Sequence, residues 1–192
     1  MRILYTASEA LPYAASGGLA DVAGSLPAAL CKAGHDCRVV LPLYKSIKPE
    51  LRKDLRFLMN FTVDVGWRKQ YCGVFEGHAN NVTYYLLDNE YYYARDGLYG
   101  FYDDCERFVF LSRAVMELIR HIDWKPQIIN CNDWQTALVP VYYQTYYKYQ
   151  HGYEDIKTVF TIHNIQYQGK YGMDVLNEVM GIPMYHANLL EY

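Results

Sequence analysis

With 192 residues, of which 52% are hydrophobic, the chain is long enough to bury the core of one large domain or two small ones. Its 18 basic and 21 acidic residues include no basic run, which excludes the electrostatic footprint of a nucleic-acid-binding protein. No apolar run reaches the roughly 20 residues of a membrane span and the first ten residues do not form a secretory signal, so we expect a cytoplasmic protein without membrane partners.

The start of the chain predicts a strand, a helix and a second strand. Residues 2–6 form a short apolar run, and apolar residues then recur at helical spacing over residues 22–33 until Gly34. Residues 37–42 form a β-branched strand. Such a unit normally contains two parallel strands joined by a right-handed crossover. Pro27 lies inside the helical pattern, where it either kinks the helix or shifts its effective start.

Between about residues 57 and 88 the pattern changes to that of a β-meander or hairpin. Short polar or glycine-containing turns separate the segments FTVDVGW, QYCGVFEG and VTYYLLD. We interpret this region as a small β insertion at the edge of the sheet.

Helices and strands alternate again in the second half of the chain. A helix is expected from Asp103 to His121, opened by the capping pattern Asp103-x-x-Glu106. The elements expected after it are a strand at 126–130, a helix from Asp133 toward Tyr149 that is interrupted by Pro140, and a strand at 156–163. The pattern predicts an α/β fold, Rossmann-like, with a doubly wound and mostly parallel sheet.

Three loops of this fold follow strands and are expected at the ligand-binding edge of the sheet. Their sequences are SEALPYAASGGLAD, NCNDWQ and HNIQYQG. In the first loop, Gly17 and Gly18 precede a helix, so that backbone N–H groups can approach an anion closely. A simple turn is the alternative, because the motif is neither the dinucleotide fingerprint nor a Walker loop.

The other two loops carry side chains that suit a sugar. Asp133 and Trp134 combine a carboxylate for hydroxyl groups with a flat indole for a sugar ring, and a helix cap followed by a core tryptophan is the alternative. His163 and Asn164 can bond hydroxyl or phosphate groups, and a structural histidine is the alternative. The 21 tyrosines suit either a glucan surface or half-buried strands and helices.

Two other chemistries lose support. Five scattered cysteines without a Cys-x-x-Cys pair predict free thiols in a reducing cytoplasm and no zinc or redox site. No second histidine lies near His163 in sequence to form a metal pair, and the Gly-x-Ser-x-Gly motif of serine hydrolases is absent from the sequence.

Taken together, the motifs resemble the N-terminal half of bacterial glycogen synthases and the related plant starch synthases. The matching segments, in order, are SEALPYAASGGLADVAGSLPAAL, GHDCRVVLP, RDGLYGFYDDCERFVFLSRAV, CNDWQTALVP and VFTIHNIQYQGKY. The resemblance implies that residues 1–192 form the N-terminal, acceptor-side domain of a GT-B glycosyltransferase. It also implies that the β insertion at about 57–88 belongs to this domain and that the C-terminal nucleotide-binding domain is absent.

Enzymes of this family transfer glucose from ADP-glucose, or in some cases UDP-glucose, to the non-reducing end of an α-1,4-glucan with retention of configuration. The resemblance therefore implies ADP-glucose and α-1,4-glucan as partners, together with the missing C-terminal domain of the same chain. It implies no cofactor and no metal, because ADP-glucose is a substrate. The isolated chain is expected to be inactive, since the C-terminal half carries most of the nucleotide site.

The resemblance also assigns roles to individual residues. The expected catalytic residues are His163 and Asp133. The expected substrate-binding residues are Ala15, Ser16, Gly17, Gly18, Asp21, Tyr99, Trp134 and Asn164.

Two positions depart from the family pattern. The family has lysine where this chain has Ala15, and its members often have histidine at the position of Asn130. Alanine can neither neutralise a phosphate nor bond a sugar hydroxyl. A second interpretation therefore stays open, in which the chain is a non-catalytic α-glucan-binding module or a degenerate synthase.

Overall fold

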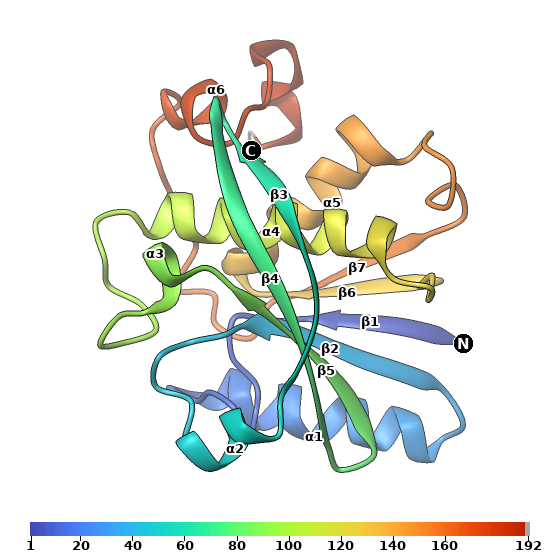
Figure 1. The fold of residues 1–192 in the computed structure, drawn as a ribbon. Helices are drawn as coiled ribbons and strands as arrows, with labels where there is room; N and C mark the ends of the chain where they lie inside the picture. Colours follow the sequence, from blue (N-terminus) through green and yellow to red (C-terminus); the bar gives the residue numbers. More distant parts are fainter. Residues whose placement is uncertain (191–192) are drawn as a thin grey trace.

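A mostly parallel sheet forms the centre of the molecule in the computed structural model, which describes residues 1–190 (Figure 1). Within those residues it has seven strands in the order β3-β4-β5-β2-β1-β6-β7. The parallel strands are β1 (Arg2–Thr6), β2 (Asp36–Pro42), β5 (Val82–Asp88), β6 (Ile128–Asn132) and β7 (Lys157–Thr161). The α/β class and the mostly parallel sheet predicted from the sequence are confirmed.

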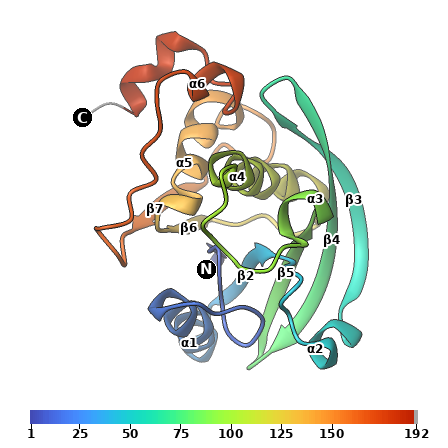
Figure 2. The ribbon, with the colours of Figure 1, turned by 90° about the vertical axis from the view of Figure 1, so that its left-hand side faces the viewer.

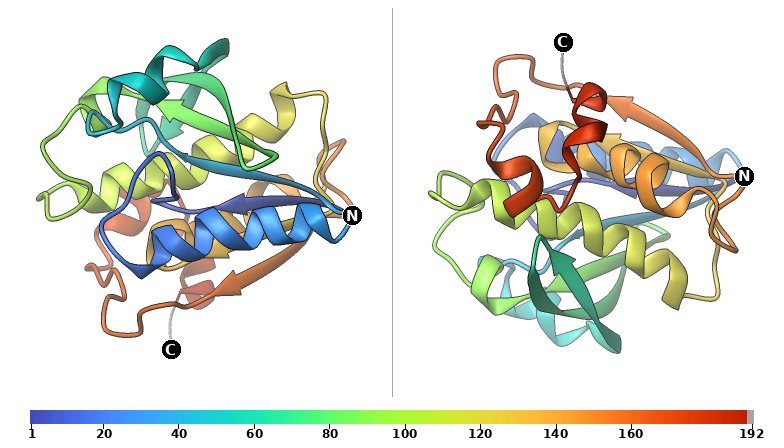
Figure 3. Two further views of the ribbon diagram at one scale, coloured as in Figure 1. Left: turned by 90° about the horizontal axis from the view of Figure 1, so that it is seen from below. Right: turned by 90° about the horizontal axis from the view of Figure 1, so that it is seen from above.

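Helices cover both faces of this sheet, as the views from below and above show (Figure 3). On one face lie α1 (Gly18–Lys32) and α2 (Pro49–Lys53). On the other face lie α3 (Glu90–Tyr93), α4 (Asp104–His121), η1 (Trp134–Thr136), α5 (Leu138–Tyr142) and η2 (Tyr143–Tyr147). The last elements are α6 (Val175–Glu178) and η3 (Met184–Leu189). Because both faces are covered, the central strands are apolar along nearly their whole length.

The antiparallel part of the sheet is β3 (Arg56–Val65) with β4 (Arg68–Ala79), at the edge beyond β5. The turn between β4 and β5 has two residues, Asn80 and Asn81, with φ of 50° and 63°, as a tight hairpin turn requires. β5 itself pairs in parallel with β2, although it lies in the segment predicted as a meander. The run of short strands in the sequence does not reveal this, because strand direction depends on the partner.

Two predicted helix details differ from the structure. α1 begins after its N-cap at Gly17 and includes Pro27, so the alternative in which Pro27 shifts the start of the helix is wrong. Asp103 lies at the N-cap of α4, but its carboxylate makes no capping bond and instead pairs with Arg95, at 2.6 Å from Nη2. The ion pair replaces the expected capping box because Arg95 supplies two charge-assisted donors.

The cysteines and the helices provide two further observations. All five cysteines, each within the described residues, are free thiols. Burial raises the pKa of Cys37 and of Cys131, in each case to about 12, so that both thiols stay protonated at neutral pH. Over residues 1–190, every helix is too short or too polar to cross a bilayer.

Candidate functional site

The loops that follow β1, β6 and β7 lie side by side at the carboxyl edge of the sheet, which faces the viewer in Figure 2. The register sets their alignment: Thr6 of β1 is opposite Cys131 of β6, and Asn132 is opposite Thr161 of β7. Ligands of open parallel sheets bind beyond this edge. The three loops expected to carry the site are therefore adjacent in the fold.

Asp133 anchors the loop that follows β7. Its Oδ1 accepts the backbone N–H of His163 at 2.7 Å and that of Asn164 at 3.3 Å, across 30 residues of sequence. The backbone of Asp133 has φ of 57° and ψ of 177°, a region that L-residues rarely occupy. Asp133 is only 8% exposed and makes no capping bond to η1. The predicted helix cap is therefore wrong, because the carboxylate is used by the neighbouring loop.

The unusual backbone of Asp133 also changes the helix that was expected from Asp133 toward Tyr149. In place of one helix interrupted at Pro140, the segment forms η1, α5 and η2, and Pro140 lies within α5. The Thr136 hydroxyl accepts the N–H of Asn132 at 2.6 Å and holds the chain in the sharp turn before η1. The left-handed backbone of Asp133 and this bond prevent a regular first helical turn.

The ring of His163 is oriented by a second polar group. Its Nε2 lies 2.8 Å from Oδ1 of Asn132. The amide nitrogen of Asn132 donates to the carbonyl oxygen of Thr6 at 3.0 Å and to Oδ1 of Asn130 at 2.7 Å, which fixes the orientation of the amide. Oδ1 of Asn132 can then only accept, so Nε2 of His163 carries the proton. Nδ1 is left for a ligand, since no group in residues 1–190 pairs with it.

This network gives Asn130 a structural role, although the family often has histidine there. Asn130 supplies both its side-chain oxygen and its backbone carbonyl to the amide nitrogen of Asn132. Asn132 is fully buried, and the sequence pattern had not pointed to it. In the sequence, Asn132 is marked only by its position at the end of β6, one residue before Asp133.

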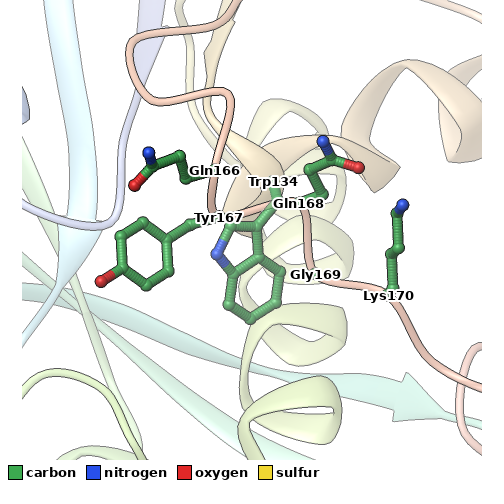
Figure 4. A pocket seen from close by; sticks show the side chains of 6 residues that line it. All are labelled: Trp134, Gln166, Tyr167, Gln168, Gly169 and Lys170. Atoms are coloured by element: carbon green, nitrogen blue, oxygen red, sulfur yellow. The ribbon is translucent and has the colours of Figure 1, made fainter.

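Trp134 lines a cavity of 380 Å³ together with Gln166, Tyr167, Gln168, Gly169 and Lys170 (Figure 4). The indole packs edge-on against Phe108, with ring centroids 5.1 Å apart. Gly169 crosses the indole so closely that a Cβ atom there would lie 2.5 Å from Cδ2 of Trp134. Trp134 is half-buried: it packs against the core, as the alternative interpretation expected, and it also lines the cavity, while its role as a sugar-binding surface stays a prediction. Lys170 brings a positive charge to this cavity.

Gly17 and Gly18 lie at the N-terminus of α1 and are exposed. Neither residue has a positive φ, and a Cβ atom on Gly18 would meet nothing within 4 Å. Their own conformation and packing therefore do not require glycine. No side chain within residues 1–190 caps α1, so the first N–H groups of the helix remain open to an anion.

The residue before this pair, Ser16, is tied down by a carboxylate. Its backbone N–H donates to Oε2 of Glu9, a residue that is only 4% exposed. Burial raises the pKa of Glu9, hydrogen bonding to Ser16 and Gly17 opposes this rise, and the negative charge of Asp133 adds to it. Glu9 lies in the loop that follows the first strand, but no motif in the sequence marks it as buried.

The structure places the other expected ligands as follows. The Tyr99 hydroxyl lies 2.7 Å from Oγ of Ser8, and its ring packs against Phe108 with centroids 5.8 Å apart. The Tyr99 hydroxyl thus already has a partner within the protein. Ala15 and Asp21 are exposed, and Asp21 lies in the first turn of α1.

Comparisons with known proteins give consistent results. The model of the starch synthase catalytic domain matches residues 2–192. A glycogen synthase of Clostridium botulinum (strain Alaska E43 / Type E3) is 53% identical over 182 residues, which are 94% of this chain and 38% of that protein. One from Clostridium beijerinckii is 52% identical over 185 residues, or 96% of this chain and 39% of that protein.

A solved structure agrees with these relatives. It is the catalytic domain of starch synthase IV from Arabidopsis thaliana, bound to ADP and acarbose. Its TM-score is 0.89 and its identity 30%, covering 97% of this chain and 38% of the other. The chain thus spans about 38% of the length of the relatives it matches, corresponding to their N-terminal region.

Proposed function

The chain belongs to the starch synthase catalytic domain family, and we propose that it forms the acceptor-side half of a retaining glucosyltransferase with the GT-B architecture. The proposed reaction moves glucose from ADP-glucose, with UDP-glucose as the alternative donor, to the non-reducing end of an α-1,4-glucan. A C-terminal nucleotide-binding domain is the proposed partner that completes the site. Residues 1–192 alone are then inactive.

One observation carries this proposal: an uncapped helix N-terminus and a histidine of fixed tautomer meet at one sheet edge beside a tryptophan-lined cavity. A diphosphate needs N–H donors, a glucosyl group needs oriented acceptors and donors, and a glucan needs an aromatic surface. The proposed site brings all three kinds of group to the carboxyl edge of the sheet. The solved relative that binds ADP and acarbose supports the same combination of ligands.

In this proposal the departing diphosphate lies over the exposed amides of Gly17 and Gly18, where the positive end of the α1 dipole stabilises negative charge. Nδ1 of His163 is available to a hydroxyl group of the transferred glucose. Asp133 acts by holding the His163 and Asn164 segment against the sheet. Such pre-oriented polar groups stabilise developing charge without reorganising during the reaction.

The remaining proposed contacts involve the acceptor and the nucleotide. Trp134 and Tyr167 line the cavity that would receive a sugar ring of the glucan. Asp21 and Asn164 would bond hydroxyl groups. The donor nucleotide is a substrate, so the proposal needs no resident cofactor or metal. The five free thiols suit the reducing cytoplasm, which is the compartment that we propose.

Transfer of labelled glucose from ADP-glucose to glycogen tests the proposal. The full-length protein with its C-terminal half should be active, whereas His163→Ala should lower kcat by at least about a hundredfold, as loss of one oriented group does. Tyr149→Ala, at a residue that is 88% exposed, is the matched control and should leave kcat unchanged. Absence of transfer with both nucleotide sugars would contradict the proposal.

The second candidate function is a non-catalytic α-glucan-binding module or degenerate synthase, which Ala15 favours. If it holds, the 192-residue chain binds maltooligosaccharides by titration calorimetry. The full-length protein is then inactive, and Ala15→Lys restores transfer because lysine again neutralises a phosphate. A flat titration together with an active full-length protein removes this candidate.

A further inference from the structure

Glu9 is a buried carboxylate in a place where a negative charge is unfavourable. It lies under the loop that is proposed to hold a diphosphate, with Oε1 only 3.8 Å from the position that a Cβ atom on Gly17 would take. In residues 1–190 its carboxylate accepts the Ser16 backbone N–H, hydrogen bonding to Ser16 and Gly17 opposes the rise of its pKa on burial, and no cation pairs with it. A buried charge with no ion partner costs stability unless its hydrogen bonds compensate. The hydrogen bond from Ser16 therefore compensates for the burial of the Glu9 carboxylate.

Tyr99 reaches the same loop from a distant part of the sequence. Its hydroxyl pairs with Oγ of Ser8 at 2.7 Å, 91 residues away. Burial raises the pKa of Tyr99, the charge of Glu9 adds to this shift, and hydrogen bonding to Ser8 and Ser16 opposes it. Ser8, Glu9, Ser16 and Tyr99 thus form one polar cluster that joins the end of β1, the glycine loop and the loop before α4.

The glycine loop needs such a support. Gly17 and Gly18 are exposed and have no side chains that could pack, and glycine is the residue that loses most conformational freedom on ordering. Glu9 accepts the N–H of the residue immediately before the pair and so holds the backbone that leads into the two glycines. A binding loop whose N–H groups are pre-oriented loses less free energy when its ligand binds.

We propose that Glu9 and Tyr99 are positioning residues that hold Ser16 and thereby aim the N–H groups of the Gly17–Gly18 loop at the diphosphate of the donor. This inference rests on the proposed function for the identity of the ligand. Glu9 acts as a hydrogen-bond acceptor and its charge is not required. Tyr99 acts through Ser8 and Ser16, and its hydroxyl does not contact the sugar.

Steady-state kinetics of the full-length protein with ADP-glucose test the proposal. Glu9→Ala should raise KM for ADP-glucose by roughly tenfold, the value of one hydrogen bond, and change kcat less. Glu9→Gln keeps an acceptor oxygen at the same reach and should restore KM to within about threefold of wild type. Glu50→Gln, on the exposed helix α2, is the matched control. Equal losses in Glu9→Ala and Glu9→Gln would overturn the proposal.

Hydrogen–deuterium exchange of the 192-residue chain tests the hydrogen bond between Ser16 and Glu9 without an activity measurement. The Ser16 amide should exchange at least about tenfold faster in Glu9→Ala than in wild type, and return to slow exchange in Glu9→Gln. Unchanged exchange in Glu9→Ala would refute the role of Glu9. If Glu9→Ala does not fold, Tyr99→Phe keeps the ring against Phe108 and should still speed exchange of the loop. Slow exchange of the Ser16 amide in wild type without any glucosyl transfer would reject the proposed function, while the role of Glu9 in holding Ser16 would stand.

Discussion

The two sides of the candidate site are built by opposite means. On one side, which we call the Asp133 side, the buried residues Asn132 and Asp133 bond the ring and the backbone of the exposed residue His163. On the other side, the glycine side, Gly17 and Gly18 present exposed bare backbone, with open space around the Cβ position of Gly18. Side chains shape the first side, and their absence shapes the second.

This difference indicates on which side a substitution can change function without changing stability. On the Asp133 side, a substitution removes partners of buried groups, so it affects folding and the site together. On the glycine side, a Cβ atom on Gly18 meets no atom within 4 Å, so a substitution there affects only what enters the site. Four predictions test this distinction.

The largest effect is expected at Asp133. Asp133→Ala removes the acceptor of two backbone N–H groups and keeps a left-handed backbone, so the free energy of unfolding should fall by about 3 kcal/mol. Urea denaturation measures this change. Asp133→Asn is the control, since it keeps an acceptor oxygen and tolerates positive φ, and it should lose less than about 1 kcal/mol. Equal losses for the two variants would show that the network does not stabilise the fold.

The next largest effect is expected at Gly169, which passes over the indole of Trp134. Gly169→Ala places a Cβ atom against the ring and strains a φ of 60°, so unfolding should become easier by about 2 kcal/mol. Gly100→Ala, with φ of 90° and no atom within 4 Å, is the matched control and should cost about 1 kcal/mol from strain alone. Near-ultraviolet circular dichroism should change in the first variant only. A similar loss in both would mean that Trp134 moves freely.

Gly18→Ala should separate binding from folding. The free energy of unfolding should change by less than about 1 kcal/mol, because alanine fits the open space and favours the helix. Binding of ADP-glucose to the full-length protein should weaken about tenfold, since the added methyl group lies where the proposed function brings the phosphates to the backbone. Calorimetric titration checks the affinity. Unchanged affinity would mean that the glycine pair is only a turn.

The smallest effect is a pH dependence at Glu9. Burial raises its pKa above the ordinary 4.5, so the folded state binds this proton more tightly than the unfolded state. Its contribution to stability is full below pH 4.5 and is lost as the pH rises through the raised value. The pH dependence of urea unfolding should therefore become flatter in Glu9→Gln. A slope identical to that of wild type would assign the titration to another group.

The sequence alone determined the fold class and the edge of the sheet at which the three candidate loops lie. Near-continuous apolar runs such as residues 37–42 require cover on both faces, which indicates a parallel sheet, and the loops after such strands meet at one edge. The motifs around Gly17, Asp133 and His163 were therefore recognisable together, and the resemblance to a family followed from them. These inferences succeed because they depend on local patterns and on strand order.

Only the tertiary structure decided what individual polar groups do. The sequence pattern around Asp133 is that of a helix cap, but Asp133 instead holds a loop 30 residues away. The role of Glu9 follows only from its hydrogen bond with Ser16. The parallel direction of β5 (Val82–Asp88) also depended on its partner β2. Sequence spacing does not encode which distant donor a buried carboxylate meets, because that choice is made when the strands pair and the loops pack.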